Sequence, residues 1–277
     1  MQTVTLPCGV TVPAYGMGTW YIGDSARTRA EEIATLKRGL DLGASLIDTA
    51  EMYGDGRAEM LVGEAIAGRR DDAFVVSKVY PHNATRQGAV AACERSLKRL
   101  ATDRIDLYLL HWRGNVPFAE TMAAFDSLRR QGKIRHYGVS NLDLEDMEAL
   151  WHTPGGDGVQ VNQVLYNLGR RGIEWDLQPW LRARRVPVMA YSPVEQGRLL
   201  SDARLAKLAR SLGHTPAQLA IAWLARQGDV IVIPKTATRA RLEENVAACG
   251  LELSPETLAA LDRIFPPPSG AEPLAML

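Results

Sequence analysis

Net charge is the first thing that this sequence lacks. Lys and Arg together number 32, Asp and Glu together also number 32, and the formal net charge is zero. A neutral chain has no overall attraction to nucleic acid or to an anionic membrane surface. Charged residues make up 23% and hydrophobic residues 46% of the chain, which is typical of a folded globular protein and excludes a disordered one. We therefore predict a small-molecule partner, with no nucleic acid and no membrane.

Cysteines are few, and long hydrophobic runs are absent. The three cysteines, Cys8, Cys93 and Cys249, lie far apart, and none forms a Cys-x-x-Cys pair. This distribution fits a reduced cytoplasmic protein better than a disulfide scaffold. The chain has no apolar run of about 20 residues that would span a membrane, and its first residues show no signal-peptide pattern. We expect a cytoplasmic protein.

Several motifs that indicate common chemistries are also missing. The chain has no Gly-x-Gly-x-x-Gly dinucleotide fingerprint, no P-loop, no Tyr followed four residues later by Lys, and no His-Glu-x-x-His. The five histidines are scattered along the chain, so we predict no metal site. A bound nucleotide would have to be held by loops of another kind.

What the sequence does contain is an alternation of short apolar runs and longer amphipathic segments. The apolar runs predict strands at 15–17, 45–47, 74–76, 105–110, 136–139, 159–162, 186–190 and 230–233. The amphipathic segments predict helices at 29–42, 57–67, 85–100, 118–131, 144–151, 177–183, 216–226 and 239–248. Such alternation indicates βαβ units around a parallel sheet. Eight units without a break predict a (β/α)8 TIM barrel, with residues 1–277 as one domain.

The two ends of the chain fall outside this alternation. Residues 4–12 alternate in hydropathy around Pro7-Cys8-Gly9, which predicts a β-hairpin that caps the bottom of the barrel. The cluster Pro266-Pro267-Pro268-Ser269-Gly270 breaks regular structure. We therefore expect residues 266–277 to form an extended tail, which would be able to close over a site at the barrel mouth.

Polar or ionisable residues follow seven consecutive apolar runs. They are Asp48, Ser77, Lys78, His111, Ser140, Asn141, Gln163, Tyr191, Ser192 and Lys235. The strand ends of a parallel barrel all point to one face, and that face carries the active site. Strand ends also become polar simply on reaching solvent, but that alternative explains this choice of side chains poorly. We predict a functional site at this face.

Three of these residues, with a nearby tyrosine, suit the reduction of a carbonyl group. Asp48 and Lys78 would form a buried ion pair, and Tyr53 lies five residues beyond Asp48. An adjacent ammonium favours the phenolate and lowers the pKa of a phenol from about 10, which makes Tyr53 a candidate proton donor. His111 would orient the carbonyl oxygen, on which negative charge develops as hydride arrives. Hydride has to come from a cofactor, because no side chain supplies it.

The segment after the eighth apolar run offers a phosphate site. Lys235, Thr236 and Arg241 surround the start of a predicted helix, where backbone N–H groups also favour an anion. The alternative interpretation is a helix capped by Thr238 with solvated charges beside it.

These motifs resemble those of the aldo-keto reductases, a family of NADPH-dependent (β/α)8 barrels. The resemblance covers nearly the whole chain. The motifs are Gly16-Met17-Gly18-Thr19-Trp20, Asp48-Thr49-Ala50-Glu51-Met52-Tyr53-Gly54, Ser77-Lys78, Leu109-Leu110-His111-Trp112, Gly138-Val139-Ser140-Asn141, Val161-Asn162-Gln163, Ala190-Tyr191-Ser192-Pro193 and Ile233-Pro234-Lys235-Thr236. The resemblance implies an NADPH-dependent reductase of aldehydes and ketones, which we expect to be a cytoplasmic monomer.

The resemblance also implies roles for single residues. Tyr53 would be the general acid, Asp48 and Lys78 would tune its pKa, and His111 would orient the substrate. The cofactor contacts would be Thr19, Trp20, Asp48, Ser140, Asn141, Gln163, Tyr191, Ser192, Lys235, Thr236, Arg241, Glu244 and Asn245. Among these, Lys235, Thr236 and Arg241 match the site of the ribose 2′-phosphate. The substrate pocket would be walled by Trp20, Tyr53, His111 and Trp112, although both tryptophans also suit plain core packing.

Two features of the chain bear on specificity and on rival functions. Only residues 112–117 separate His111 from the next predicted helix, as in bacterial members of the family with open pockets, so we expect broad specificity for small carbonyls. One alternative is a Schiff-base aldolase that uses Lys78 or Lys235. Another is a non-catalytic NADPH sensor.

Overall fold

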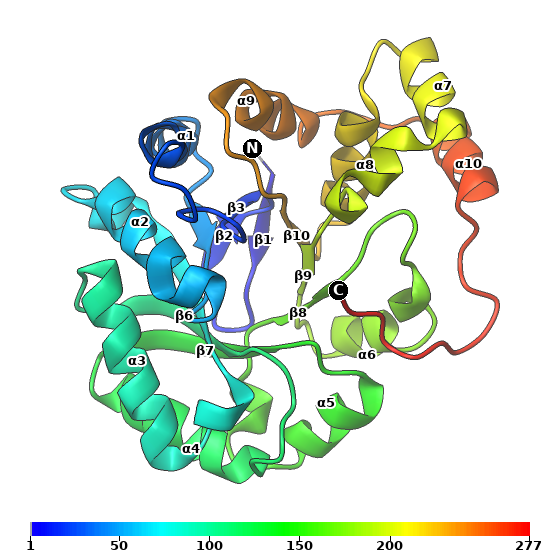
Figure 1. The fold of residues 1–277 in the computed structure, drawn as a ribbon. Coiled ribbons are helices and arrows are strands. Elements are labelled where there is room, and N and C mark those ends of the chain that lie inside the picture. Colours follow the sequence, from blue (N-terminus) through cyan, green and yellow to red (C-terminus); the bar gives the residue numbers. More distant parts are fainter. Residues whose placement is uncertain (1) are drawn as a thin grey trace.

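The computed structural model describes residues 2–277 and contains a barrel of eight parallel strands (Figure 1). Each strand pairs with the next in chain order, and parallel bridges Tyr15–Val232 and Gly18–Lys235 join the first to the last. The strands are β3 (Gly16–Gly18), β4 (Leu46–Asp48), β5 (Phe74–Val79), β6 (Ile105–Leu110), β7 (Ile134–Ser140), β8 (Asn162–Leu165), β9 (Val188–Tyr191) and β10 (Val230–Ile233). The predicted TIM barrel is confirmed.

Helices surround the barrel and connect its strands (Figure 1). The eight predicted helices are present, each within one residue of its expected bounds. They are α1 (Arg29–Asp41), α2 (Arg57–Ile66), α3 (Arg86–Leu100), α4 (Phe118–Arg130), α5 (Leu144–Trp151), α6 (Leu177–Ala183), α8 (Pro216–Ala225) and α9 (Arg239–Ala248). Short 3-10 helices lie at η1 (Tyr53–Gly56), η2 (Arg70–Asp72), η3 (Pro81–Asn83), η4 (Gly156–Gly158), η5 (Gly172–Glu174) and η6 (Glu195–Ser201).

Two further helices were not predicted, namely α7 (Ala203–Ser211) and α10 (Pro255–Ile264). Both begin with a strong cap. Asp202 accepts hydrogen bonds from the first N–H groups of α7, and Ser254 caps α10 directly before Pro255. Ser or Asp at the cap and Pro at the first helical position are the usual start signals, so these cap residues would have identified both helices.

The N-terminal hairpin closes the bottom of the barrel. Strands β1 (Thr3–Thr5) and β2 (Thr11–Pro13) pair antiparallel, and the hairpin's apolar side chains are buried against the inward-facing residues of the barrel strands. This confirms the predicted cap.

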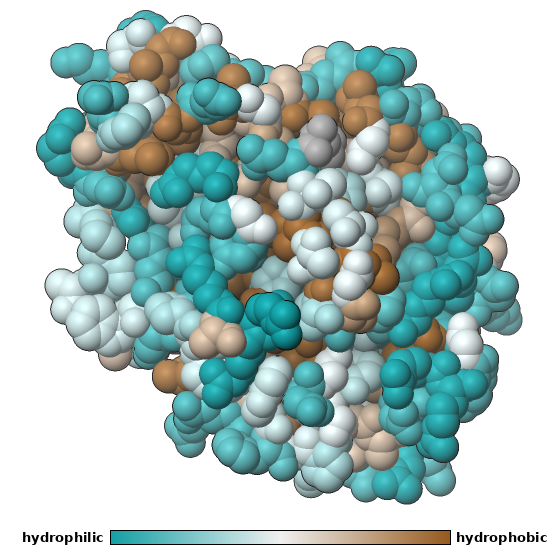
Figure 2. All heavy atoms as spheres, turned by 180° about the vertical axis from the view of Figure 1, so that it is seen from behind, coloured by the Kyte–Doolittle hydropathy of each residue, from teal (hydrophilic) through white to brown (hydrophobic). Residues whose placement is uncertain are grey.

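The molecule seen from behind is mostly hydrophilic, with hydrophobic residues in scattered groups (Figure 2).

Several strands run further than predicted, into their polar ends. The sixth strand was predicted at 159–162 but forms at Asn162–Leu165, so Gln163 lies inside it. The apolar residues before it form an irregular lead-in, where the Gln160 N–H donates to the Tyr137 carbonyl. Similarly, Ser77, Lys78 and Ser140 lie within strands. Hydropathy underestimates these strands because their last side chains are buried polar groups.

The segment after α10 has no helix or strand over residues 266–277, and in Figure 1 its red trace runs down the right side and then turns inward to the C-terminus near the centre. Its last two residues, Met276 and Leu277, line the main cavity of the protein. Among residues 2–277, no helix is long and apolar enough to cross a membrane.

Candidate active site

A cavity of about 880 Å³ opens at the carboxyl ends of the barrel strands. Its size is typical of a site for a cofactor together with a small substrate. Its lining includes the following residues expected at the site: Thr19, Trp20, Asp48, Tyr53, His111, Trp112, Ser140, Asn141, Gln163, Tyr191, Ser192, Lys235, Thr236, Arg241, Glu244 and Asn245. The structure thus gathers these residues, distant in sequence, around one space.

Lys78 lies beneath the cavity floor and links two of the expected catalytic residues. Its ammonium Nζ is 2.8 and 2.9 Å from the two carboxylate oxygens of Asp48, 2.9 Å from the Thr49 carbonyl and 3.2 Å from the Tyr53 hydroxyl. The Lys78 side chain is 0% exposed and that of Asp48 is 3% exposed. A buried charge of this kind needs a partner, and each of these two residues supplies it for the other.

Burial shifts the pKa values of Lys78 and Tyr53, and the shift for Tyr53 is opposite to the one that the sequence predicted. We expected the ammonium to lower the pKa of the phenol, but burial and the nearby Asp48 carboxylate raise it well above 10. Burial lowers the pKa of Lys78, and Asp48 opposes that shift. Desolvation disfavours the charged form of each group, which explains both directions. Tyr53 therefore holds its proton at neutral pH.

His111 faces Tyr53 across the cavity, at the end of β6. Its ring lies edge-on to the Tyr53 ring, with 5.9 Å between centroids. Burial, with a smaller contribution from the Lys78 charge, lowers the pKa of His111 well below 6.5. Within residues 2–277 the buried Nδ1 atom has no hydrogen-bond partner. His111 is therefore a neutral imidazole with hydrogen-bonding capacity to spare.

Aromatic residues form the wall around these polar groups. Trp20 stacks on Tyr21 at 4.8 Å and faces Tyr53 at 6.5 Å, while Trp112 lies 4.8 Å from the His111 ring. Both tryptophans line the cavity. Their position favours the pocket interpretation over plain core packing.

Amide and hydroxyl side chains occupy the next sector of the cavity. The Gln163 side-chain amide donates to the Asp48 carboxylate at 2.7 Å, and the Ser140 hydroxyl donates to the backbone carbonyl of Gln163 at 2.8 Å. Asn141 donates to the His111 carbonyl and accepts from the Tyr191 hydroxyl at 3.0 Å. These contacts connect the side-chain amides of Asn141 and Gln163, both in the cavity lining, to His111 and Asp48.

Two cations of the cavity lining, Lys235 and Arg241, lie at the start of α9. Among residues 2–277, neither Lys235 nor Arg241 forms an ion pair, whereas the nearby Arg239 pairs with Glu31. Thr238 occupies the cap position of α9, but its side chain makes no capping hydrogen bond, so that part of the alternative is wrong. Lys235 and Arg241 are exposed, as the alternative expects of its solvated charges. Uncapped N–H groups beside free cations form a site suited to a phosphate.

Other lining residues were missed in the sequence, mainly from two segments. Gln196, Gly197 and Leu200 belong to η6, which follows β9, and Thr215 and Ala217 belong to the start of α8. Gln196 has a left-handed φ of 53° and Gly197 one of 94°. The Gly197 position and the Thr215-Pro216 helix start were visible signals of a turn and a cap, but neither signal shows which cavity a segment faces.

Comparisons with known proteins agree with this geometry. The profile of the aldo/keto reductase family matches residues 14–265. Methylglyoxal reductase YeaE of Escherichia coli is 52% identical over 273 residues, which are 97% of this chain and 96% of that protein. Glyoxal reductase of Bacillus subtilis is 30% identical over 263 residues, covering 95% of this chain and 92% of that protein.

Solved structures are similar over the whole chain. An aldo/keto reductase from Klebsiella pneumoniae, crystallised with NADP and acetate, is 49% identical with a TM-score of 0.97, covering 100% of this chain and 99% of that one. The thermostable aldo-keto reductase Tm1743 is 38% identical with a TM-score of 0.88, covering 95% of this chain and 100% of that one.

Proposed function

Since the chain belongs to the aldo/keto reductase family, we propose that it reduces small aldehydes and ketones to alcohols with NADPH. The observation that carries the proposal is the position of Lys78 Nζ, within hydrogen-bonding distance of both Asp48 and Tyr53 at the floor of the cavity. A retained proton donor beside a buried ion pair is what protonation of a nascent alkoxide requires.

The residues of the cavity fit NADPH. When bound, this cofactor supplies the hydride. Lys235 and Arg241, without ion pairs among residues 2–277, would hold its 2′-phosphate. Ser140, Asn141 and Gln163 would hold the carboxamide, and Tyr191, at the end of β9, would lie against the nicotinamide ring. The remaining contacts would come from Thr19, Trp20, Asp48, Ser192, Thr236, Glu244 and Asn245.

In the proposed reaction, Tyr53 donates its proton to the carbonyl oxygen of the substrate. The Lys78 ammonium, 3.2 Å from the Tyr53 hydroxyl, stabilises the negative charge that then develops on the phenol. Neutral His111 orients the carbonyl oxygen by a hydrogen bond before the proton moves. Asp48 keeps Lys78 charged in a site whose burial favours the neutral amine.

We propose small α-oxoaldehydes, with methylglyoxal as the first to test, as good substrates within a broad range. The two relatives named above are reductases of methylglyoxal and of glyoxal. The wall of Trp20 and Trp112 is flat and apolar, and only residues 112–117 separate His111 from α4, so few fixed contacts select a large substrate. Met276 and Leu277, at the end of the extended tail, narrow the mouth.

We also propose a single-domain, cytoplasmic monomer. One closed barrel with its hairpin cap accounts for the fold. Burial raises the pKa of the Cys93 and Cys249 thiols to about 12, which keeps them unreactive and suits a reduced protein. Light scattering of the purified protein would test the monomer, and a mass of twice 30.4 kDa would reject it.

The direct test of function follows the loss of NADPH absorbance with a panel of carbonyls. Turnover of methylglyoxal and of simple aromatic aldehydes is expected, and its absence across the panel would reject the proposal. The same assay separates the alternatives. A sensor binds NADPH without consuming it, and an aldolase traps substrate on Lys78 under borohydride. Lys78 Nζ already has Asp48, Thr49 and Tyr53 as partners, which speaks against the aldolase.

A further inference from the structure

A second buried carboxylate lies behind the catalytic residues and contributes nothing to the cavity. Glu59 is on α2, six residues after Tyr53, and its side chain is 0% exposed. One carboxylate oxygen accepts from the Ser77 hydroxyl at 2.6 Å, and the other accepts from Nε of Arg99 at 2.6 Å. A buried charge with two short charge-assisted hydrogen bonds holds the elements that carry its partners firmly together.

The first partner connects Glu59 to Lys78. Ser77 and Lys78 are neighbours on β5 and point to opposite faces of the strand, because side chains alternate along it. Ser77 points out of the barrel toward α2, and Lys78 points in toward Asp48. The bond from Ser77 to Glu59 therefore sets the position of α2 relative to the strand that carries the Lys78 ammonium.

The second partner connects Glu59 to the turn that carries Tyr53. Arg99, at the end of α3, packs so closely on Gly56 that a Cβ at this glycine would lie 2.3 Å from Arg99 Cδ. The turn between Tyr53 and α2 has three consecutive left-handed residues, Gly54, Asp55 and Gly56, with φ of 56°, 52° and 87°. Glycine adopts this conformation without strain, so Asp55 is the one residue of the turn whose backbone depends on its surroundings.

We propose that Glu59 and Arg99 form a bracket that positions the Tyr53 hydroxyl against Lys78 Nζ, an inference that rests on the proposed function of Tyr53. Glu59 and Arg99 are positioning residues, because neither lines the cavity. Ser77, next to Lys78, connects Glu59 to strand β5. The close contact of Arg99 with Gly56 connects Glu59 to the turn that follows Tyr53. Loss of the bracket would release the turn and let Tyr53 move away from its 3.2 Å contact with Lys78 Nζ.

The consequence is a loss of rate rather than of binding. A misplacement of about 1 Å in a catalytic group costs up to about 100-fold in rate. We expect Glu59→Gln to lower kcat by about 10- to 100-fold, with KM and the Kd of NADPH changed by less than about threefold. Arg99→Ala should likewise lower kcat and leave KM and the Kd of NADPH nearly unchanged. Glu64→Gln is the matched control, since Glu64 lies on the same helix and pairs with Arg29 at the surface.

The decisive measurement combines these changes with Tyr53→Phe. If Glu59 acts through Tyr53, Glu59→Gln lowers kcat in the natural protein but has no further effect on the residual rate of Tyr53→Phe. Equal losses in both backgrounds would overturn the bracket, because a general structural defect lowers both rates alike. A kcat for Glu59→Gln that matches Glu64→Gln would overturn it too.

A readout without turnover separates this proposal from the proposed function. Urea unfolding of the two single variants and the double variant tests whether Glu59 and Tyr53 are energetically coupled. The bracket predicts that their effects on the free energy of unfolding are not additive, whereas Glu64→Gln and Tyr53→Phe add. Additive effects for both pairs would reject the bracket. If Glu59 and Tyr53 are energetically coupled but the unsubstituted protein does not consume NADPH, the bracket is supported and the reductase function is rejected.

Discussion

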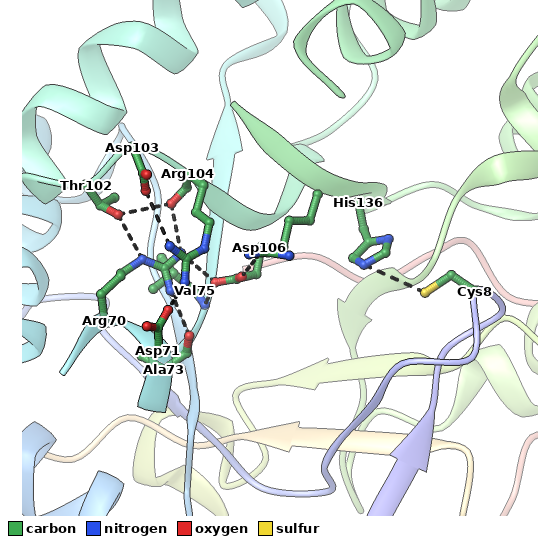
Figure 3. A network of polar contacts seen from close by, with 11 residues as sticks. Cys8, Arg70, Asp71, Ala73, Val75, Thr102, Asp103, Arg104, Asp106 and His136 are labelled. Carbon is green, nitrogen blue, oxygen red and sulfur yellow. Dashed lines mark hydrogen bonds and ion pairs between the residues drawn. The ribbon is translucent and has the colours of Figure 1, made fainter. Parts of the chain in front are cut away.

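Two networks of buried charge lie at opposite ends of the barrel, and they differ in whether they leave hydrogen-bonding groups free for a ligand. At the mouth, Asp48 ends β4 and pairs with Lys78. At the base, Asp106 is the second residue of β6 and pairs with Arg70 at 2.6 Å (Figure 3). Strands in a parallel barrel share one direction, so the start of one strand and the end of another lie on opposite faces.

In the base network the protein's own groups take up the cation's hydrogen bonds. Arg70 donates to the Thr102 hydroxyl, to the Ala73 and Arg104 carbonyls and to Asp106, and Asp106 also accepts from the Val75 N–H (Figure 3). An arginine stays charged at every relevant pH and fits such fixed geometry. We interpret this network as one that stabilises the fold.

The mouth network keeps groups available for a ligand. It uses a lysine, whose pKa burial is able to shift, and adds a phenol that retains its proton. His111 Nδ1 has no partner among residues 2–277. The comparison shows that a buried ion pair serves chemistry when it adjoins titratable groups that face a cavity. Where no such groups adjoin it, as at Arg70 and Asp106, the pair serves stability.

The largest difference between the mouth and the base is expected in kcat, for Tyr53→Phe at the mouth. Loss of the proposed general acid should lower kcat by about 10²- to 10⁴-fold, because Tyr53 is the one proton donor among the partners of Lys78 Nζ in residues 2–277. Binding of NADPH, followed by protein fluorescence, should change little. Asp106→Asn at the base should leave kcat of the folded protein unchanged. A Tyr53→Phe variant with its full rate would remove Tyr53 as the acid.

Stability should respond at both ends, but more strongly at the mouth. Lys78→Met leaves the Asp48 carboxylate buried and unpaired, which we expect to lower the free energy of unfolding by about 3–5 kcal/mol. Asp106→Asn at the partly exposed base should cost about 1–3 kcal/mol. Urea unfolding of both variants measures the difference. A larger loss for Asp106→Asn would reverse our interpretation of the two networks.

Arg239 and Arg241 offer a comparison within one helix, α9. Arg241→Ala should weaken NADPH binding by about 10- to 100-fold and NADH binding much less, because a charge-assisted bond to the 2′-phosphate is lost. Arg239→Ala is the control, since Arg239 pairs with Glu31. Equal losses of affinity for the two cofactors in Arg241→Ala would contradict the assigned phosphate site.

The smallest effect concerns pH. Reduction requires protonated Tyr53 and charged Lys78, so its rate should fall as pH rises toward the lowered pKa of Lys78, below 10.5. The pKa of Tyr53 is raised above 10, so its ionisation should not be the first to limit the rate. The pKa of His111 is lowered below 6.5, and acidification to pH 6 should not slow the reaction. A profile of kcat against pH with an acid limb near 6.5 would contradict a neutral His111.

The sequence predicted the barrel well because each strand and helix carries its own local pattern. Eight apolar runs correspond to eight strands, and polar residues at their ends mark the mouth. The displaced strand at Asn162–Leu165 shows the limit of that approach. Buried polar side chains such as Gln163 belong to a strand only because partners such as Asp48 satisfy them. Those partners lie far away in the sequence.

Residue identities along the chain were sufficient to place Asp48, Tyr53, Lys78 and His111 at one end of a barrel, because strand direction and alternation are local properties. They were not sufficient to give the direction of the Tyr53 pKa, the lack of a Thr238 cap, or the contacts of Glu59 with Ser77 and Arg99. Each of these depends on how deeply a group is buried and on which distant residue meets it. Desolvation and hydrogen bonding are properties of packed surroundings, and the surroundings of these residues exist only once the barrel has closed.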